Sequence, residues 1–196
     1  IETPEKARAW VQTAARTGID GLKRNAYPPE SMAALLDEAK KLGLGTTAHL
    51  SQSGVANMNA LDAARLGLGT VTHFYGLFEA LYAGHDIQPW LPGDNTDDEP
   101  QRFGQVARQW NLVHARGSEE SNALLEEFKA LGVILDPTMT AYLAGRDVMA
   151  RRSAEWHEQY TLPSLWDCYQ SSRVNQGSSF FGWITSAEPA WPHSST

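Results

Sequence analysis

Two histidines occupy equivalent places in a repeated stretch of the sequence. The segment "KLGLGTTAHL" covers residues 41–50 and "RLGLGTVTHF" covers 65–74, so that His49 and His73 lie 24 residues apart. Neutral imidazole is a common ligand of zinc and related divalent ions. If each histidine ends a strand of one parallel sheet, strands about 4.8 Å apart bring both rings within reach of one ion. The pair therefore predicts a shared metal site.

A lysine precedes this pair at a similar spacing. Lys23 lies 26 residues before His49, at the end of "GIDGLKR". We therefore expect Lys23, His49 and His73 at one level of three neighbouring strand ends, and Asp136 and Thr138 of "VILDPTMT" at a similar level on a fourth. Each residue also has a structural interpretation, as a hydrogen-bonded histidine or a solvent-exposed lysine. Two histidines in equivalent positions favour the metal interpretation.

The elements that must position these residues follow a repeated order of helix, glycine and strand. Apolar residues at helical spacing predict helices over residues 4–17, 28–43, 55–67 and 118–132, which end at Gly18, Gly43, Gly67 and Gly132. The strands expected after them lie in "GIDGLKR", "LGTTAHL", "GTVTHFY" and "VILDPTMT". This alternation indicates parallel βα units. Right-handed crossovers then make the four strands neighbours in one sheet.

Two segments depart from this order. Residues 77–117 are rich in proline, glycine, aspartate and aromatic residues, and they predict a long excursion with a short helix near "FGQVARQW". Residues 143–196 contain four tryptophans among polar residues: Trp156, Trp166, Trp183 and Trp191. We expect a domain over residues 1–142 and an aromatic-rich, irregular lid or loop segment over 143–196.

Composition excludes several classes of function. The chain has 196 residues and a formal net charge of −7, with no cluster of lysine and arginine, which argues against a nucleic-acid partner or an anionic membrane surface. No apolar run approaches the roughly 20 residues that span a bilayer. Cys168 is the only cysteine, so an intrachain disulfide is impossible. The start of the sequence is neither a signal peptide nor an initiator methionine, and it leaves the compartment open.

Four segments together resemble a known family of enzymes. "GIDGLKRNAY", "KLGLGTTAHL", "RLGLGTVTHFYG" and "GVILDPTMT" look like the amidohydrolase superfamily, and are most similar to its imidazolonepropionase-like and prolidase-like branch. The resemblance covers roughly residues 4–142. It implies a partial TIM (β/α)8 barrel whose βα units correspond to strands four to seven. In that superfamily the fifth and sixth strands end in metal-binding histidines, which match His49 and His73.

The resemblance also implies a reaction and further site residues. It implies a hydrolase for an amide, lactam or related C–N bond of a small molecule. One or two divalent ions, Zn²⁺ or another metal, activate water and polarise the carbonyl. In several branches the lysine matched by Lys23 is carboxylated and bridges two metals. Tyr75, just after His73, is expected to approach the substrate. The proton shuttle is an aspartate on strand eight, so Asp136, on the strand counted as seven, is not that residue.

Several family features lie outside this sequence. The His-x-His of the first strand does not occur, and no strand follows to carry the shuttle aspartate. The sequence therefore resembles an internal fragment, with at most weak metal affinity and no useful hydrolysis of its own. Exposed edges of half a barrel would also favour self-association.

Two other functions remain open on the sequence alone. One is a Schiff-base aldolase with Lys23 as the nucleophile. The other is a non-catalytic module that binds carbohydrate or protein through its aromatic segments, with the βα units as a scaffold.

Overall fold

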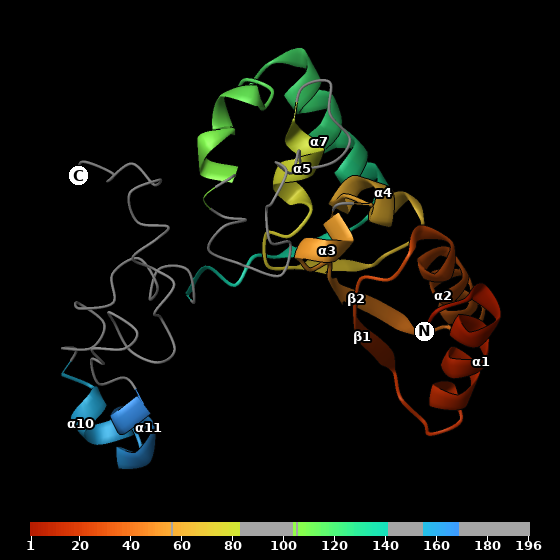
Figure 1. The fold of residues 1–196 in the computed structure, drawn as a ribbon, viewed down its shortest axis with the longest axis horizontal. Helices are drawn as coiled ribbons and strands as arrows, with labels where there is room; N and C mark the ends of the chain where they lie inside the picture. The colour runs from red at the N-terminus through yellow and green to blue at the C-terminus, as the bar shows by residue number, and fades with distance from the viewer. Residues whose placement is uncertain (56, 83–103, 105, 141–154, 169–196) are drawn as a thin grey trace. The chain divides into compact units, whose positions relative to one another are not determined.

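The computed structural model describes residues 1–55, 57–82, 104, 106–140 and 155–168. The chain divides into two compact units, Ile1–Asp97 with Gln109–Pro137 and Asp98–Arg108 with Thr138–Thr196. The first unit contains the sheet and the helices around it (Figure 1). Two short helices of the second unit, α10 and α11, fall within the predicted aromatic segment, and their bounds are His157–Tyr160 and Pro163–Cys168.

A four-stranded parallel sheet forms the centre of the first unit. Its strands lie in the order β1-β2-β3-β4, and each pairs in parallel with the next. The bounds are Gly21–Asn25, Gly45–His49, Thr70–Thr72 and Ile134–Asp136. The predicted parallel α/β architecture is therefore confirmed. β3 is shorter than "GTVTHFY" predicts, because residues 73–76 form a turn.

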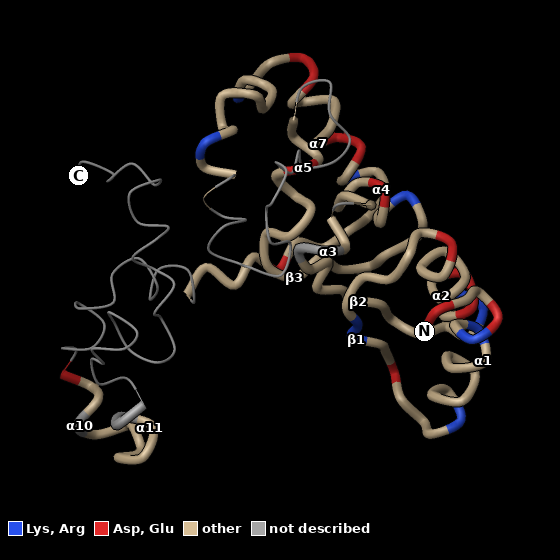
Figure 2. Tube along the Cα trace, in the orientation of Figure 1, with Lys and Arg blue, Asp and Glu red and all other residues tan. Residues whose placement is uncertain are grey.

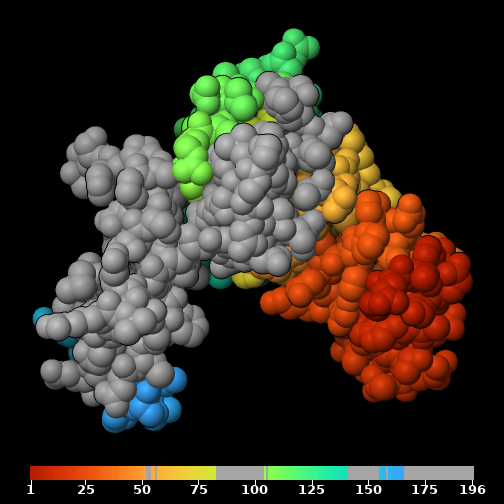
Figure 3. Space-filling view, in the orientation of Figure 1, coloured from red at the N-terminus to blue at the C-terminus, as the bar shows by residue number. Residues whose placement is uncertain are grey.

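The first two helices, α1 (Pro4–Ala15) and α2 (Pro29–Lys41), lie side by side next to β1 and β2 (Figure 1). The Thr3 hydroxyl accepts a hydrogen bond from the Lys6 N–H at 3.3 Å and caps α1, and a proline begins each helix. Most of their predicted apolar stripes are buried, at Ala7, Val11, Met32, Leu35, Leu36 and Ala39. Trp10 and Ala14, predicted in the stripe of α1, are half-buried. Residues 1–50 form one continuous block of red and orange atoms in Figure 3.

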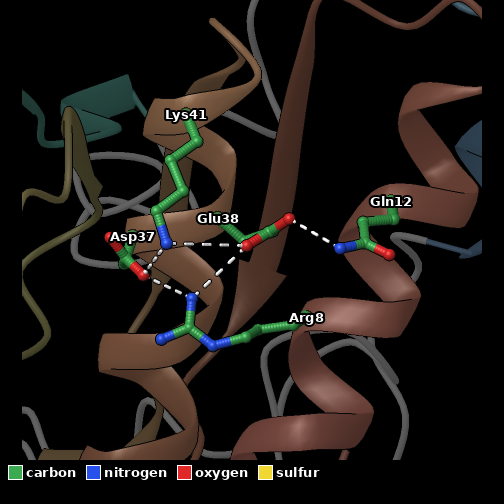
Figure 4. Close-up of polar contacts among 5 residues, drawn as sticks. All are labelled: Arg8, Gln12, Asp37, Glu38 and Lys41. Atoms are coloured by element: carbon green, nitrogen blue, oxygen red, sulfur yellow. Dashed lines mark hydrogen bonds and ion pairs between the residues drawn. The ribbon is translucent and has the colours of Figure 1, made fainter.

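Polar side chains join α1 to α2 at the edge of this apolar contact (Figure 4). Arg8 bonds to Asp37 and also approaches Glu38 at 3.4 Å. Gln12 donates to Glu38 at 2.8 Å, and Lys41 donates to Asp37 at 2.7 Å. Figure 2 shows that charged residues concentrate along α1, α2, α4 and α7. The five side chains of Figure 4 are called the α1–α2 network below.

One predicted helix is two in the structure. The sequence predicts a single helix over residues 55–67, but α3 covers Gln52–Val55 and α4 covers Ala60–Arg65. The cause is a capping box. The Asn59 side chain accepts hydrogen bonds from the Leu61 and Asp62 N–H groups at 2.9 and 3.0 Å, and the Asp62 carboxylate accepts one from the Asn59 N–H at 3.2 Å. These bonds begin a new helix at Asn59.

Besides the helical residues near 104–108, three helical segments are described between β3 and β4. They are α5 (Leu77–Leu81), the 3-10 turn η1 (Trp110–Leu112) and α7 (Glu119–Leu131). Ser118 caps α7, since its hydroxyl accepts a hydrogen bond from the Ser121 N–H at 3.2 Å. Of the helix expected in "FGQVARQW", residues 104 and 106–108 are helical. Residues 83–103 of the expected excursion lie outside the described residues.

The predicted helix-ending glycines are confirmed. Gly18, Gly43, Gly67 and Gly132 all have left-handed backbones, with φ of 80°, 70°, 100° and 68°. Glycine adopts this conformation without the steric strain of a Cβ, and it commonly ends a helix for that reason. None of the described helices is long and apolar enough to cross a membrane.

The sheet has one helix-covered face and one polar face. Right-handed crossovers between successive strands put α2, α4 and α7 on the same side. Leu22, Ala48 and Val71 are buried on this helix-covered face. Because register partners share a face, the polar face carries the alternate residues of each strand. These are Lys23, Asn25, Thr47, His49, Thr70, Thr72, Ile134 and Asp136.

Candidate functional site

The two histidine rings meet at the carboxyl end of the sheet. The ring centroids of His49 and His73 are 5.0 Å apart, and the ring planes lie at 75° to one another. Two imidazoles on one tetrahedral zinc, with Zn–N distances of about 2.0–2.1 Å, have ring centroids roughly 5 Å apart. The structure therefore brings together the two residues that the sequence pairs, at a separation that suits a shared ion.

The strand register differs from the equivalence that the repeat predicts. Thr47 pairs with Thr70 and Ala48 with Val71, so that β3 is shifted by one residue against the repeat. A one-residue shift turns every side chain of a regular strand to the other face. β3 ends at Thr72, however, and His73 has a left-handed backbone with φ of 61°. This turn, rather than strand pairing, directs the His73 ring to His49.

A backbone hydrogen bond holds the turn in place. The His73 N–H donates to the Asp136 carbonyl at 2.7 Å and so ties the end of β3 to the end of β4. A left-handed conformation costs a non-glycine residue roughly 1–2 kcal/mol. Ser51, just after β2, has φ of 43° and shares this conformation. Backbone strain of this kind is concentrated at functional sites. Both strand ends that carry the histidines show it.

Tyr75 packs against both histidines. Its ring centroid is 4.3 Å from that of His49 and 6.2 Å from that of His73, and only 2 % of the residue is exposed. Gly76 follows with φ of 81°, and a Cβ there would lie 2.7 Å from the Ala60 nitrogen. The tight turn thus places the Tyr75 ring against the rings of His49 and His73. Its role as a substrate-binding residue stays a prediction.

Lys23 and His49 do not stand at the same level. The register pairs Lys23 with Thr47 and Asn25 with His49, so the equal level expected from sequence spacing is wrong. Lys23 still belongs to the polar face, two residues before Asn25. Sequence reasoning missed Asn25, although a signal was present. Gly21 begins β1 and Gly45 begins β2. Asn25 lies as far after Gly21 as His49 lies after Gly45.

The electrostatic surroundings favour neutral His73. Burial lowers the pKa of His73 from its ordinary value, and the charge of Lys23 lowers this pKa further. Asp136 opposes both with a smaller effect in the other direction. Neutral imidazole is the form that binds a metal. Thr138, expected near Asp136, belongs to the second unit of the chain.

Within the part of the chain that the structure describes, no group of three or more His, Cys, Asp or Glu residues is arranged to hold a metal ion. The described site thus consists of two imidazoles, the buried Tyr75, and the polar side chains of the neighbouring strand ends. Comparison with models of protein families and with curated proteins found no match.

Proposed function

We propose that this chain carries part of the active site of an amidohydrolase-type, metal-dependent hydrolase. The substrate would be a small molecule with an amide, lactam or related C–N bond. The observation that carries the proposal is the contact of the His49 and His73 rings at the carboxyl ends of two neighbouring parallel strands. This end of a parallel sheet is where α/β enzymes place their ligands.

The arrangement of strands supports the finer fold proposal. Four parallel strands in sequential order, with helices between them, are what strands four to seven of a (β/α)8 barrel would contribute. The polar face would then be the interior of the barrel. In this proposal residues 1–142 contribute the barrel part, and the lid or loop segment expected over 143–196 lies outside the described residues except for 155–168.

Each residue of the site has a proposed task. His49 and His73 would hold one divalent ion, Zn²⁺ by preference, which would supply Lewis acidity and an activated water when bound. Burial lowers the pKa of His73, which favours the neutral form that binds a metal. Tyr75 packs against both rings and would help to position them. Lys23 would join the site as a carbamate, and its anionic form would reverse its present effect on the pKa of His73.

Metal titration of the chain tests this proposal. We expect weak binding that saturates at one Zn²⁺ or Co²⁺ per chain, measured by calorimetry and by the visible spectrum of bound Co²⁺. We expect His49→Ala and His73→Ala each to weaken binding by 10-fold or more, as estimated from the loss of one of few ligands.

His114→Ala is the matched control. His114 belongs to the same unit but lies next to the isolated β-bridge between Tyr82 and Val113. There its backbone N–H donates to the Leu81 carbonyl at 2.9 Å. Its replacement should leave the Co²⁺ spectrum unchanged. Equal binding by wild type and both site variants would refute the shared site.

A further inference from the structure

Asn25, the last residue of β1, lies beside His49 at the carboxyl end of the sheet. The two residues are register partners, and β2 lies between β1 and β3. Register partners share a face of the sheet, and neighbouring strands are about 4.8 Å apart. His73 follows β3, on the opposite side of β2, and its ring meets that of His49. Asn25, His49 and His73 therefore follow one another along three neighbouring strand ends.

Hydrogen bonding and packing fix the backbone that follows Asn25. The Ala26 N–H donates to the His49 carbonyl at 3.1 Å and so ties the end of β1 to the end of β2. Ala26 also lies close to α3, because a Cβ added to Gly54 would clash with the Ala26 Cβ. These contacts set the position of the Asn25 backbone relative to that of His49.

The residue before Asn25 is anchored on the opposite face of the sheet. Arg24 belongs to the helix-covered face, where its register partner Ala48 is fully buried. Its guanidinium carbon lies 4.4 Å from the ring centroid of Trp10 in α1 and 5.3 Å from that of Tyr27. Cation–π contacts of this kind attract the guanidinium to the rings. Asn25 therefore lies between two anchored residues, and a binding site requires side chains that are held in this way.

The carboxamide of Asn25 has the chemistry of a substrate-binding group rather than of a metal ligand. Zinc in proteins is bound by thiolate, imidazole and carboxylate groups, and a neutral carboxamide is not among them. The NH₂ group offers two hydrogen-bond donors. Asn25 is exposed, so its side chain can meet a small molecule at the strand ends. A neutral donor beside the two imidazoles of the proposed metal site suits an oxygen that gains negative charge.

We propose that Asn25 binds the substrate and that its NH₂ group donates a hydrogen bond to the carbonyl oxygen of the amide or lactam. When hydroxide adds to the carbonyl carbon, a C–O bond forms and the π electron pair of the C=O bond moves to this oxygen. The hydrogen bond strengthens as the negative charge grows, and no proton leaves Asn25. The inference rests on the proposed function and adds the role of β1. This strand supplies the donor, whereas β2 and β3 carry the two imidazoles at their ends.

Dimethylphosphinate is the probe for this contact, because its tetrahedral phosphorus carries two oxygens that share a negative charge. The phosphinate is titrated calorimetrically into the chain at a Zn²⁺ concentration that saturates the metal site. We expect Asn25→Ala to weaken phosphinate binding about tenfold or more, from the loss of one hydrogen bond to a charged oxygen. The affinity for Zn²⁺ itself should change less than about twofold, in contrast to that of His49→Ala, since the carboxamide is not a ligand.

An NMR measurement and a control variant separate direct contact from a structural effect. In the ¹⁵N-labelled chain, the NH₂ resonances of Asn25, identified by their loss in Asn25→Ala, should shift when phosphinate is added. The matched control is Asn122→Ala, because Asn122 is exposed on α7, which covers the other face of the sheet. Its affinities for Zn²⁺ and for phosphinate should equal those of the wild type. Circular dichroism establishes that each variant is folded.

Asn25→Asp provides two changes of opposite sign. Aspartate has nearly the same shape as asparagine, but its carboxylate repels the phosphinate and is a good zinc ligand. We expect tighter binding of Zn²⁺ and weaker binding of phosphinate than in the wild type. Three results would overturn the inference alone: phosphinate that does not bind the Zn²⁺-loaded wild type, phosphinate that binds Asn25→Ala equally well, or unshifted NH₂ resonances. Absence of Zn²⁺ binding by the wild type would overturn the proposed function and this inference with it.

Discussion

At the scale of single residues, the conformation of His73 decides the geometry of the site. The sequence repeat predicts that His49 and His73 lie together, and they do. It does not predict how, because the repeat holds no information about the register between β2 and β3. The shift of one residue in that register would separate the rings, and the left-handed turn at His73 compensates for it.

This turn predicts an unusual order of stability among variants. We expect His73→Gly to be more stable than His73→Ala by about 1 kcal/mol, since glycine relieves the left-handed strain and alanine retains it. The measurement is the free energy of unfolding in urea. At His49, within a regular strand, the order should be the reverse, because glycine weakens a strand. The same order at both positions would contradict the role of the turn.

Asn25 shows the limit of sequence spacing at this scale. The interval between Lys23 and His49 is close to that between the histidines, and it suggested equal levels. Strand register is set by hydrogen bonds and side-chain packing. Two residues of one strand that are two positions apart lie on the same face of the sheet but pair with different residues of the neighbouring strand. The structure accordingly places Asn25 beside His49 and Lys23 beside Thr47.

At the scale of elements, the helices were more predictable than the strands. Stop glycines and apolar stripes place α1, α2 and α7 within a few residues of their observed bounds. The split between α3 and α4 was missed, because the apolar spacing of residues 55–67 continues across Asn59, where the side-chain cap interrupts the helix. β3 and β4 are shorter than predicted, since β propensity does not show where pairing stops.

The α1–α2 network predicts how stability depends on pH. The bonds from Lys41 and Arg8 lower the pKa of Asp37, and those from Gln12 and Arg8 lower that of Glu38. Carboxyl groups with a lowered folded pKa stabilise the fold above their unfolded pKa. This stability is lost as pH falls through the acid range below about 4. We expect the free energy of unfolding to decrease there.

A pair of variants separates this network from general acid effects. Asp37→Asn should flatten the dependence on pH, measured by urea unfolding between pH 2 and 6. The control is Glu2→Gln, which removes the pair of Glu2 with Lys6 on the exposed surface of the same helix region. Its curve should follow that of the wild type. An unchanged slope in Asp37→Asn would exclude the network as the cause.

At the scale of the whole molecule, the alternation of helix and strand predicted the parallel sheet and its order. The segment between α5 and η1 could not be predicted in the same way, because proline, glycine and aspartate set no period. The expected lid over residues 143–196 falls outside the described residues except for 155–168, and it stays a prediction.

Metal binding should appear in the stability of the molecule as a whole. A ligand at 100 times its dissociation constant stabilises the folded state by about 2.7 kcal/mol. For a chain of this size, we expect Zn²⁺ at that concentration to raise Tm by roughly 5 °C or more, and a chelator to reverse the rise. The measurement is calorimetric unfolding. An equal rise in the double variant His49→Ala/His73→Ala would place the metal elsewhere.

The spacing of strands along the chain has a consequence for the order of folding. Connections of about 20 residues join β1 to β2 and β2 to β3. In contrast, about 60 residues separate β3 from β4, where Thr70 pairs with Ile134. Closing the longer loop costs roughly 1 kcal/mol more in chain entropy. The first three strands should therefore assemble early, during synthesis, and β4 should join last. His73 reaches its final conformation only at that step, when the carbonyl of Asp136 arrives to accept its N–H.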